Sequence, residues 1–176
     1  MDKELIKGLI AEYQQFVKGV SFVKRAVTLS DNFNYVFVGL RRVGKSYLMY
    51  QQIHHLIETG ISPEEILFFN FEDERIAGMD TEHFDMIKRC YEEMYSHRPI
   101  FFLDEIQIVP HWEQFVRRLA DQKYRVYVTG SNAKMLSKDI ATTLGGRFMI
   151  QYVYPFSFRE YLSSNGVQLD KLWIYK

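Results

Sequence analysis

The clearest motif in the sequence is a short segment that contains two glycines separated by four residues, followed by a lysine and a serine. Residues 39–46 read GLRRVGKS and match the pattern G-x-x-x-x-G-K-[ST] in full. Glycines let the backbone turn tightly and direct several N–H groups at phosphate oxygens. A lysine in this position binds the β- and γ-phosphates, and the hydroxyl that follows it ligates a magnesium ion. The segment therefore predicts a nucleotide-binding site whose contacts come from Gly39, Arg41, Arg42, Val43, Gly44, Lys45, Ser46 and Tyr47.

The two arginines of this segment have a second interpretation. Arg41 and Arg42 are either solvated side chains at the tip of the loop or contacts to phosphate or to a partner. Ser46 is the residue expected to ligate Mg²⁺.

Two adjacent carboxylates end an apolar run later in the chain. Residues 100–105 read IFFLDE. The carboxyl ends of parallel strands meet at one edge of a sheet, so this pair is expected beside the phosphate loop. Asp104 would hold Mg²⁺ directly or through water, and Glu105 would orient and polarise an attacking water. The alternative is a polar strand end that caps the next turn.

A second polar strand end follows at residues 126–132, VYVTGSN. Ser131 or Asn132 could contact the γ-phosphate or the attacking water. Either residue could equally serve as a helix N-cap, and the two roles are compatible.

The elements that must position these residues alternate along the chain. Buried strands are expected near 35–38, 66–71, 99–103, 124–128 and 148–153, and helices near 45–59, 81–97, 111–122 and 132–143. This alternation predicts an α/β fold with a five-stranded parallel sheet covered on both faces. An amphipathic helix over residues 5–17 precedes it.

The order of elements favours one class of phosphate-loop protein. A strand and a helix separate the loop from the acidic strand, as in the additional-strand ATPases. A small P-loop kinase is the rival, but it would need an arginine-rich lid, and only Arg117-Arg118 approaches such a cluster. Guanine-binding proteins use an Asn-Lys-x-Asp segment, which does not occur here, so adenine is the expected base.

The composition of the chain limits the kinds of partner and the cellular compartment that we expect. The 176 residues suit one domain. Lys plus Arg and Asp plus Glu each number 22, a balance that argues against a dedicated nucleic-acid coat, although a local basic patch is compatible with it. Cys90 is the only cysteine, and its expected role is that of a small buried hydrophobe. The sequence has no apolar run long enough to span a bilayer, and a reducing cytoplasm is the simplest compartment.

Several motifs together resemble a known family. They are VGLRRVGKS at 38–46, NFED at 70–73, LDEIQ at 103–107, WE at 112–113, TGSNA at 129–133, LGGR at 144–147 and YPFSFREY at 154–161. The chain resembles, from about residue 20 to residue 162, the AAA-type ATPase domain of a widespread group of bacterial and archaeal ATP-binding proteins. In that group the domain usually precedes a C-terminal region of uncertain function.

The resemblance implies a role for particular residues. It makes Glu105 the catalytic acid, Ser131 or Asn132 the first sensor, and Arg147 an arginine finger acting across a homo-oligomer. Arg25 would lie on the adenine side of the site. Glu72 and Asp73 would lie near the γ-phosphate or cap a loop.

The resemblance also implies a division of the chain. Residues 1–30 would form the N-terminal helix and lead-in, 31–155 the nucleotide-binding core, and 156–176 the start of a truncated C-terminal region. The missing region would supply a second sensor, so hydrolysis is expected to be weak in this form. The alternative to a Mg²⁺-dependent ATPase is a non-catalytic module in which bound ATP orders a surface for a partner.

Overall fold

The protein is built around a single parallel sheet. The structure, a computed structural model, describes residues 2–131, 135 and 139–167. The strands are β1 (Asn34–Val38), β2 (Ile66–Asn70), β3 (Ile100–Asp104), β4 (Val126–Gly130) and β5 (Phe148–Tyr152). Their order is β2-β3-β4-β1-β5, and all neighbours are parallel. Because β4 lies between β1 and β3, the predicted additional-strand arrangement is confirmed.

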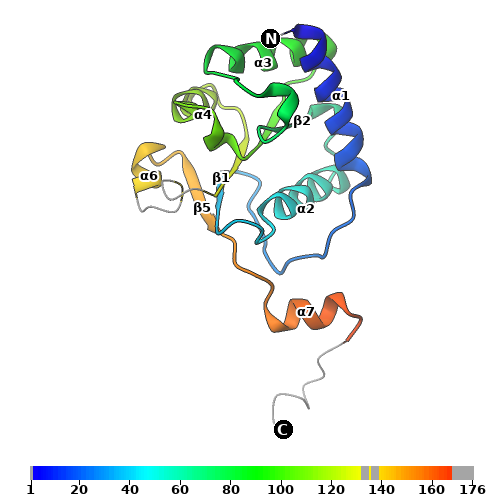
Figure 1. Cartoon of the computed structure of the whole chain (residues 1–176). Coiled ribbons are helices and arrows are strands. Elements are labelled where there is room, and N and C mark those ends of the chain that lie inside the picture. The colour runs from blue at the N-terminus through cyan, green and yellow to red at the C-terminus, as the bar shows by residue number, and fades with distance from the viewer. Residues whose placement is uncertain (1, 132–134, 136–138, 168–176) are drawn as a thin grey trace.

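Helices cover both faces of this sheet (Figure 1). They are α1 (Lys3–Gly19), α2 (Lys45–Glu58), α3 (Glu82–Met94), α4 (Trp112–Asp121), α6 (Asp139–Thr143) and α7 (Phe158–Ser164). Helix α2 lies on one face, with α4 and α6 on the other. The chain moves across the sheet in one direction from β1 to β2 and in the opposite direction from β2 through β3 to β4. Because each crossover is right-handed, the helices of these two stretches lie on opposite faces.

The structure shortens one expected helix and adds another. The helix expected over 81–97 ends at Met94, because Tyr95 turns to an extended backbone with φ −133°. Helix α7 was not foreseen as a helix. Of the helix expected over 132–143, the structure describes Met135 and α6, while residues 132–134 and 136–138 lie outside the described part.

The predicted amphipathic helix at the N-terminus protects one edge of the sheet. Asp2 caps α1, and residues Ile6, Leu9 and Ile10 are buried. Gln14 Nε2 donates a hydrogen bond to the Ile66 carbonyl oxygen at 2.9 Å. An unpaired backbone group of the edge strand β2 is therefore satisfied by α1 rather than left open to another chain.

The core is rich in stacked aromatic rings. Phe102 and Tyr127 stack across β3 and β4 with centroids 4.5 Å apart, and Phe84 stacks on Phe115 at 4.4 Å. Cys90 on α3 is fully buried, and burial raises the pKa of its thiol. Within the described residues, no helix is long and apolar enough to cross a membrane.

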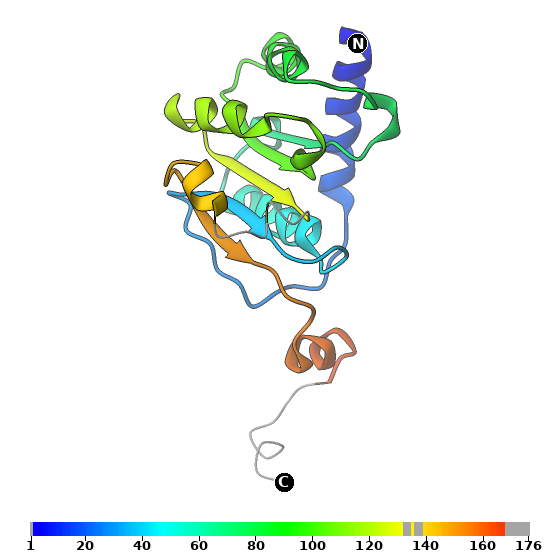
Figure 2. The same cartoon turned by 60° about the vertical axis from the view of Figure 1, so that its left-hand side comes forward.

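The last helix stands apart from this core. Figure 2 shows α7 beyond the edge at which the strands end, separated from the layers of the fold. The helix buries none of its residues. The carboxyl edge of the sheet therefore lies between the core and α7, and the loops at that edge carry the predicted site residues.

Candidate functional site

The phosphate-loop motif forms the connection between β1 and α2. Gly44 adopts a left-handed conformation, φ 92°, directly before the first turn of α2. A Cβ atom at Gly39 would collide with the Val153 carbonyl oxygen. Both glycines are thus required by the backbone. The free N–H groups at the start of α2 make this loop a site for an anion.

Lys45 lies inside the loop rather than in solvent. Its side chain is 3% exposed, and its Nζ donates to the Leu40 carbonyl oxygen at 3.0 Å. The same Nζ lies 3.6 Å from Glu105 Oε1. The ammonium group is therefore centred between the loop and the acidic strand, where an anion could bind both the loop and the lysine.

The first acid of the pair faces the hydroxyl of the loop. Ser46 Oγ donates to Asp104 Oδ1 at 3.1 Å, and Thr129 Oγ1 donates to the same oxygen at 2.5 Å. A hydroxyl beside a carboxylate suits Mg²⁺, which usually binds one or two protein oxygens together with phosphate oxygens and water. The described residues contain no group of three or more His, Cys, Asp or Glu side chains that could hold a metal alone. The donor set therefore fits a magnesium ion that arrives with phosphates.

Burial makes the ionised form of Asp104 energetically unfavourable. Burial raises its pKa from 3.8 to about 6, although hydrogen bonds from Thr129 and Ser46 act in the opposite direction. The folded state therefore holds a proton more tightly than the unfolded state does. The contribution of Asp104 to the free energy of unfolding is therefore greatest below the pKa it has in the unfolded chain. That contribution is lost as the pH rises through about 6.

The variant Asp104→Asn is expected to unfold at higher denaturant than the parent at pH 7.5. It removes a buried charge whose cost is at most about 3 kcal/mol, from a shift of about 2 pKa units. The gain should be smaller at pH 5. Urea unfolding of the nucleotide-free protein in EDTA at both pH values measures this. Glu58→Gln, at an exposed carboxylate on the last turn of α2, is the control. An equal or lower stability at pH 7.5 would contradict the expectation.

The second acid is anchored by one of its two oxygens. Glu105 is 7% exposed and has a left-handed backbone, φ 51°. Its Oε2 accepts hydrogen bonds from Ser131 Oγ at 2.8 Å and from Gln107 Nε2 at 2.5 Å. Its Oε1 faces Lys45. One oxygen is thus fixed by two donors while the other is directed toward the phosphate loop.

Sequence reasoning missed two residues of this site. Thr129 accepts from the Glu105 backbone N–H at 2.8 Å while donating to Asp104, so it orients both acids. A threonine ending the buried run VYVT was the available signal, because β3 and β4 are parallel and in register. Gln107 belongs to a short 3-10 turn after β3, and its Oε1 is buried without a partner among the described residues.

Two adjoining hollows meet at the phosphate loop. A polar one of about 440 Å³ is lined by Lys45, Ser46, Glu72 and Glu105, together with both loop arginines. A larger one of about 710 Å³ is lined mainly by apolar side chains: Phe22, Val23, Val43, Tyr47, Pro155 and Phe156. Arg42, Gly44 and Tyr47 line both. A polar hollow that adjoins an apolar one in this way matches the two ends of a nucleotide.

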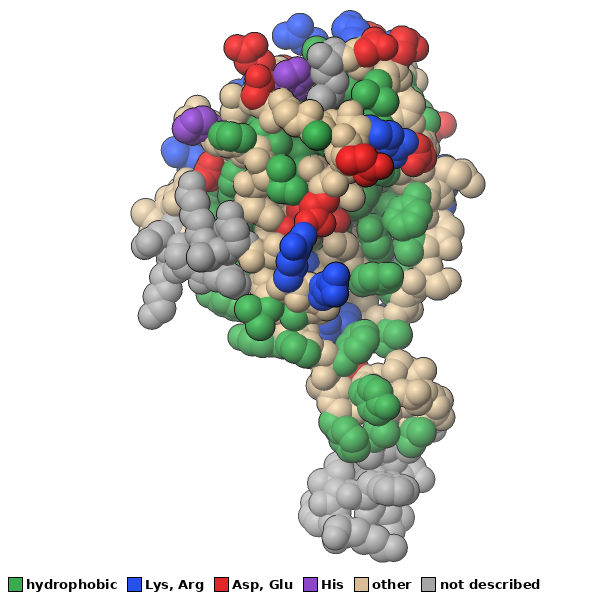
Figure 3. All heavy atoms as spheres, in the orientation of Figure 1, with side chains coloured by type: hydrophobic (Ala, Val, Ile, Leu, Met, Phe, Trp, Pro, Cys, Tyr) green, Lys and Arg blue, Asp and Glu red, His purple; other side chains and the backbone are tan. Residues whose placement is uncertain are grey.

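Charged side chains lie at the mouth of the polar hollow. Arg41 is exposed and pairs with Glu72 at 2.6 Å. Figure 3 shows basic and acidic side chains side by side on the face of the molecule above α7. Asp73 is occupied elsewhere, since it accepts from Tyr13 Oη at 2.5 Å and pairs with Arg75.

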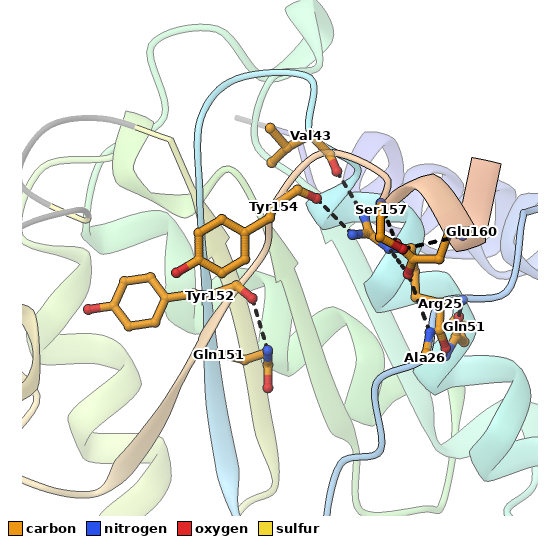
Figure 4. Close-up of polar contacts among 9 residues, drawn as sticks. All are labelled: Arg25, Ala26, Val43, Gln51, Gln151, Tyr152, Tyr154, Ser157 and Glu160. Atoms are coloured by element: carbon orange, nitrogen blue, oxygen red, sulfur yellow. Dashed lines mark hydrogen bonds and ion pairs between the residues drawn. The ribbon is translucent and has the colours of Figure 1, made fainter. Parts of the chain in front are cut away.

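The structure places the remaining candidates at some distance from one another. Arg25 lines the apolar hollow, but its guanidinium bonds to protein groups (Figure 4). Arg147 lies just before β5, at the amino end of the sheet, and its Nε donates to Asp121 Oδ1 at 2.5 Å. About 13 Å of strand separates that end from the phosphate-loop edge. Asn132 lies outside the described residues.

Comparison with known proteins agrees with this geometry. A family model described as "AAA domain" matches residues 31–162. The chain is 32% identical over 171 residues to an uncharacterized protein of Methanocaldococcus jannaschii, covering 96% of this chain and 37% of that protein. It is 33% identical over 161 residues to an uncharacterized protein of Haemophilus influenzae, covering 87% of this chain and 40% of the relative. The chain thus spans well under half the length of these relatives.

One solved structure shares the fold. AMPPCP-bound DnaA from Aquifex aeolicus superposes with a TM-score of 0.51 at 13% identity, covering 96% of this chain and 52% of that chain. The five-stranded additional-strand sheet, the phosphate loop and the family match over residues 31–162 lead to one conclusion: the chain belongs to the AAA domain family.

Proposed function

We propose that this chain binds ATP with Mg²⁺ and hydrolyses it to ADP and phosphate. The observation that carries the proposal is that Lys45, Ser46 and Glu105 line one polar hollow, which shares lining residues with an apolar one. Asp104 lies behind this hollow, hydrogen-bonded to Ser46. The phosphates would bind at the loop N–H groups, and the adenine would bind in the apolar hollow beside Tyr47.

The chain's own residues would divide the work. Lys45 Nζ would leave the Leu40 carbonyl and Glu105 Oε1 to bind the β- and γ-phosphates. Ser46 Oγ and Asp104 would hold Mg²⁺, which supplies charge neutralisation at the phosphates when bound. Glu105 Oε1, released from Lys45, would then accept a proton from the attacking water while Ser131 and Gln107 hold Oε2 in place.

A second function is supported by the same contacts. In this structure Glu105 Oε1 lies 3.6 Å from Lys45 Nζ, so the two buried charges balance each other. A module that binds ATP without hydrolysing it would retain this contact and use occupancy to order a partner surface. Phosphate release in a single-turnover experiment, with protein in excess over ATP, separates the two functions.

Replacing Lys45 by alanine is the direct test of the phosphate loop. Hydrogen bonds to charged groups contribute about 1.5–3 kcal/mol, so ATP affinity is expected to fall about tenfold or more. Titration calorimetry with AMPPCP and Mg²⁺ measures the affinity without hydrolysis. Lys18→Ala, on the exposed end of α1, is the matched control. Unchanged affinity in a folded Lys45→Ala protein would overturn the assignment, and GTP competing as well as ATP would overturn the choice of adenine.

A further inference from the structure

Arg25 joins three separate segments of the chain beneath the phosphate loop. Its Nη1 donates to the Val43 carbonyl oxygen at 3.2 Å, its Nη2 to the Tyr154 carbonyl oxygen at 2.7 Å, and its Nε to Glu160 Oε1 at 2.9 Å. The Arg25 side chain is only 9% exposed and that of Glu160 only 13%. Figure 4 shows the guanidinium enclosed by these groups. Each of its three nitrogens therefore donates to a protein atom, and three of its five N–H groups are committed in this way.

The Val43 contact fixes the orientation of a peptide group in the loop. In a planar trans peptide the C=O and the following N–H point in opposite directions. Arg25 binds the Val43 carbonyl, so the Gly44 N–H is turned away from Arg25, toward the side on which phosphates would lie. The position of a Cβ on Gly44 would lie 3.6 Å from Arg25 Nη1, which places the guanidinium directly against this peptide. Arg25 thus fixes the orientation of this peptide group in the loop.

Glu160 holds Arg25 and at the same time begins α7. Its Oε2 accepts hydrogen bonds from the Ser157 backbone N and Oγ, each at 2.8 Å, and the Ser157 side chain accepts from the Glu160 N–H. Burial alone would raise the pKa of Glu160, but the bonds from Ser157 and Arg25 outweigh it and hold the pKa at about 2. The carboxylate is therefore ionised at neutral pH and completes an ion pair that is largely shielded from solvent.

Helix α7 has few other means of attachment. None of its residues is buried, and Phe158 and Tyr161 are exposed by 71% and 57%. Next to α7, Phe156 lies under the Arg25 guanidinium at 4.9 Å and also lines the apolar hollow. The contacts that fix α7 are thus the same contacts that shape both ends of the nucleotide site.

We propose that Arg25 and Glu160 are positioning residues that raise nucleotide affinity and make the docking of α7 depend on nucleotide occupancy. The inference rests on the proposed ATP binding. Coupling between two sites is reciprocal, so the factor by which docked α7 strengthens nucleotide binding is the factor by which nucleotide strengthens docking. A segment distant from the chemistry thereby reports on the state of the phosphate loop.

The first test compares AMPPCP affinities by titration calorimetry in the presence of Mg²⁺. Glu160→Gln keeps the shape of the side chain and removes its charge. We expect its affinity to fall about fivefold or more, the lower end of the usual coupling between linked sites. Arg25→Lys keeps the charge but cannot donate to Val43, Tyr154 and Glu160 at once, so its affinity for AMPPCP should fall by a similar factor. Glu58→Gln, an exposed carboxylate at the end of α2, should bind as the parent does.

The second test is hydrogen exchange of the backbone amides of residues 158–164. AMPPCP should increase their protection in the parent protein and have little effect in Glu160→Gln. Ser157→Ala removes one hydrogen bond to Glu160, so its nucleotide-dependent protection should lie between that of the parent and that of Glu160→Gln. It replaces Glu160→Gln in this test if that variant folds poorly. Parent-like affinity in folded Glu160→Gln and Arg25→Lys, or no nucleotide effect on these amides in the parent, overturns the inference alone. Absence of AMPPCP binding by the parent overturns the proposed function and this inference with it.

Discussion

Glu105→Gln is expected to bind ATP with nearly the parent's affinity and to hydrolyse it about 10²–10⁴-fold more slowly, the range of a lost general base. The amide keeps the shape of the side chain and can still accept the hydrogen bond from Ser131 through its oxygen. It cannot take a proton from water. Single-turnover phosphate release measures the rate, and calorimetry with AMPPCP measures the affinity. Glu82→Gln, at the exposed start of α3, controls for the loss of one carboxylate.

The outcome also decides the meaning of the contact between Glu105 and Lys45. A parent-like rate in Glu105→Gln would make Glu105 a strand-end residue whose role is to balance the buried lysine charge. The assignment of Asp104 to magnesium would then require a separate test. A large fall in rate together with a large fall in affinity would instead indicate that the loop itself had collapsed.

Arg147→Ala is the second variant for which a large effect is expected, about 10³–10⁵-fold in rate if the guanidinium acts as an arginine finger. Arg147 lies at the amino end of β5, whereas the phosphate loop follows the carboxyl end of β1. It therefore lies too far from the phosphate loop of its own chain to act there. We propose that it completes the site of a neighbouring subunit in a homo-oligomer, so specific activity should rise with protein concentration.

Mixing two inactive variants tests this proposal. Arg147→Ala and Lys45→Ala should together recover part of the activity, because one mixed interface joins an intact phosphate loop to an intact Arg147. Activity that is independent of concentration, with no recovery on mixing, would retire the proposal. Arg147 would then be a surface residue whose role is the ion pair with Asp121. Repeating the mixing in longer relatives of the family tests whether further sequence is needed for assembly.

The fold could be predicted because its signals are local. Each strand is a short apolar run between turn residues, and the phosphate loop is one contiguous motif. The position of Asp104 followed from a general property of parallel sheets. The predicted five-stranded sheet and its additional strand are both confirmed by the structure.

The missed features depend on contacts that no local pattern contains. Arg25 and Glu160 are 135 positions apart in the sequence, and nothing near either residue indicates the other. Thr129 gains its role only when β3 and β4 are placed in register. Helix α7 has neither a buried face nor the length for a clear helical period, so its capping box was the only local signal. The role of Asn132 stays a prediction.

The buried cysteine of α3 has a practical consequence for following α7. Cys90 is the only thiol in the chain, it is fully enclosed, and burial raises its pKa, so it reacts slowly with maleimides and similar reagents. A cysteine introduced at the exposed Ser163 would therefore be labelled selectively in the otherwise native sequence. A fluorophore or spin label at that position would report the mobility of α7 in real time as nucleotide is added.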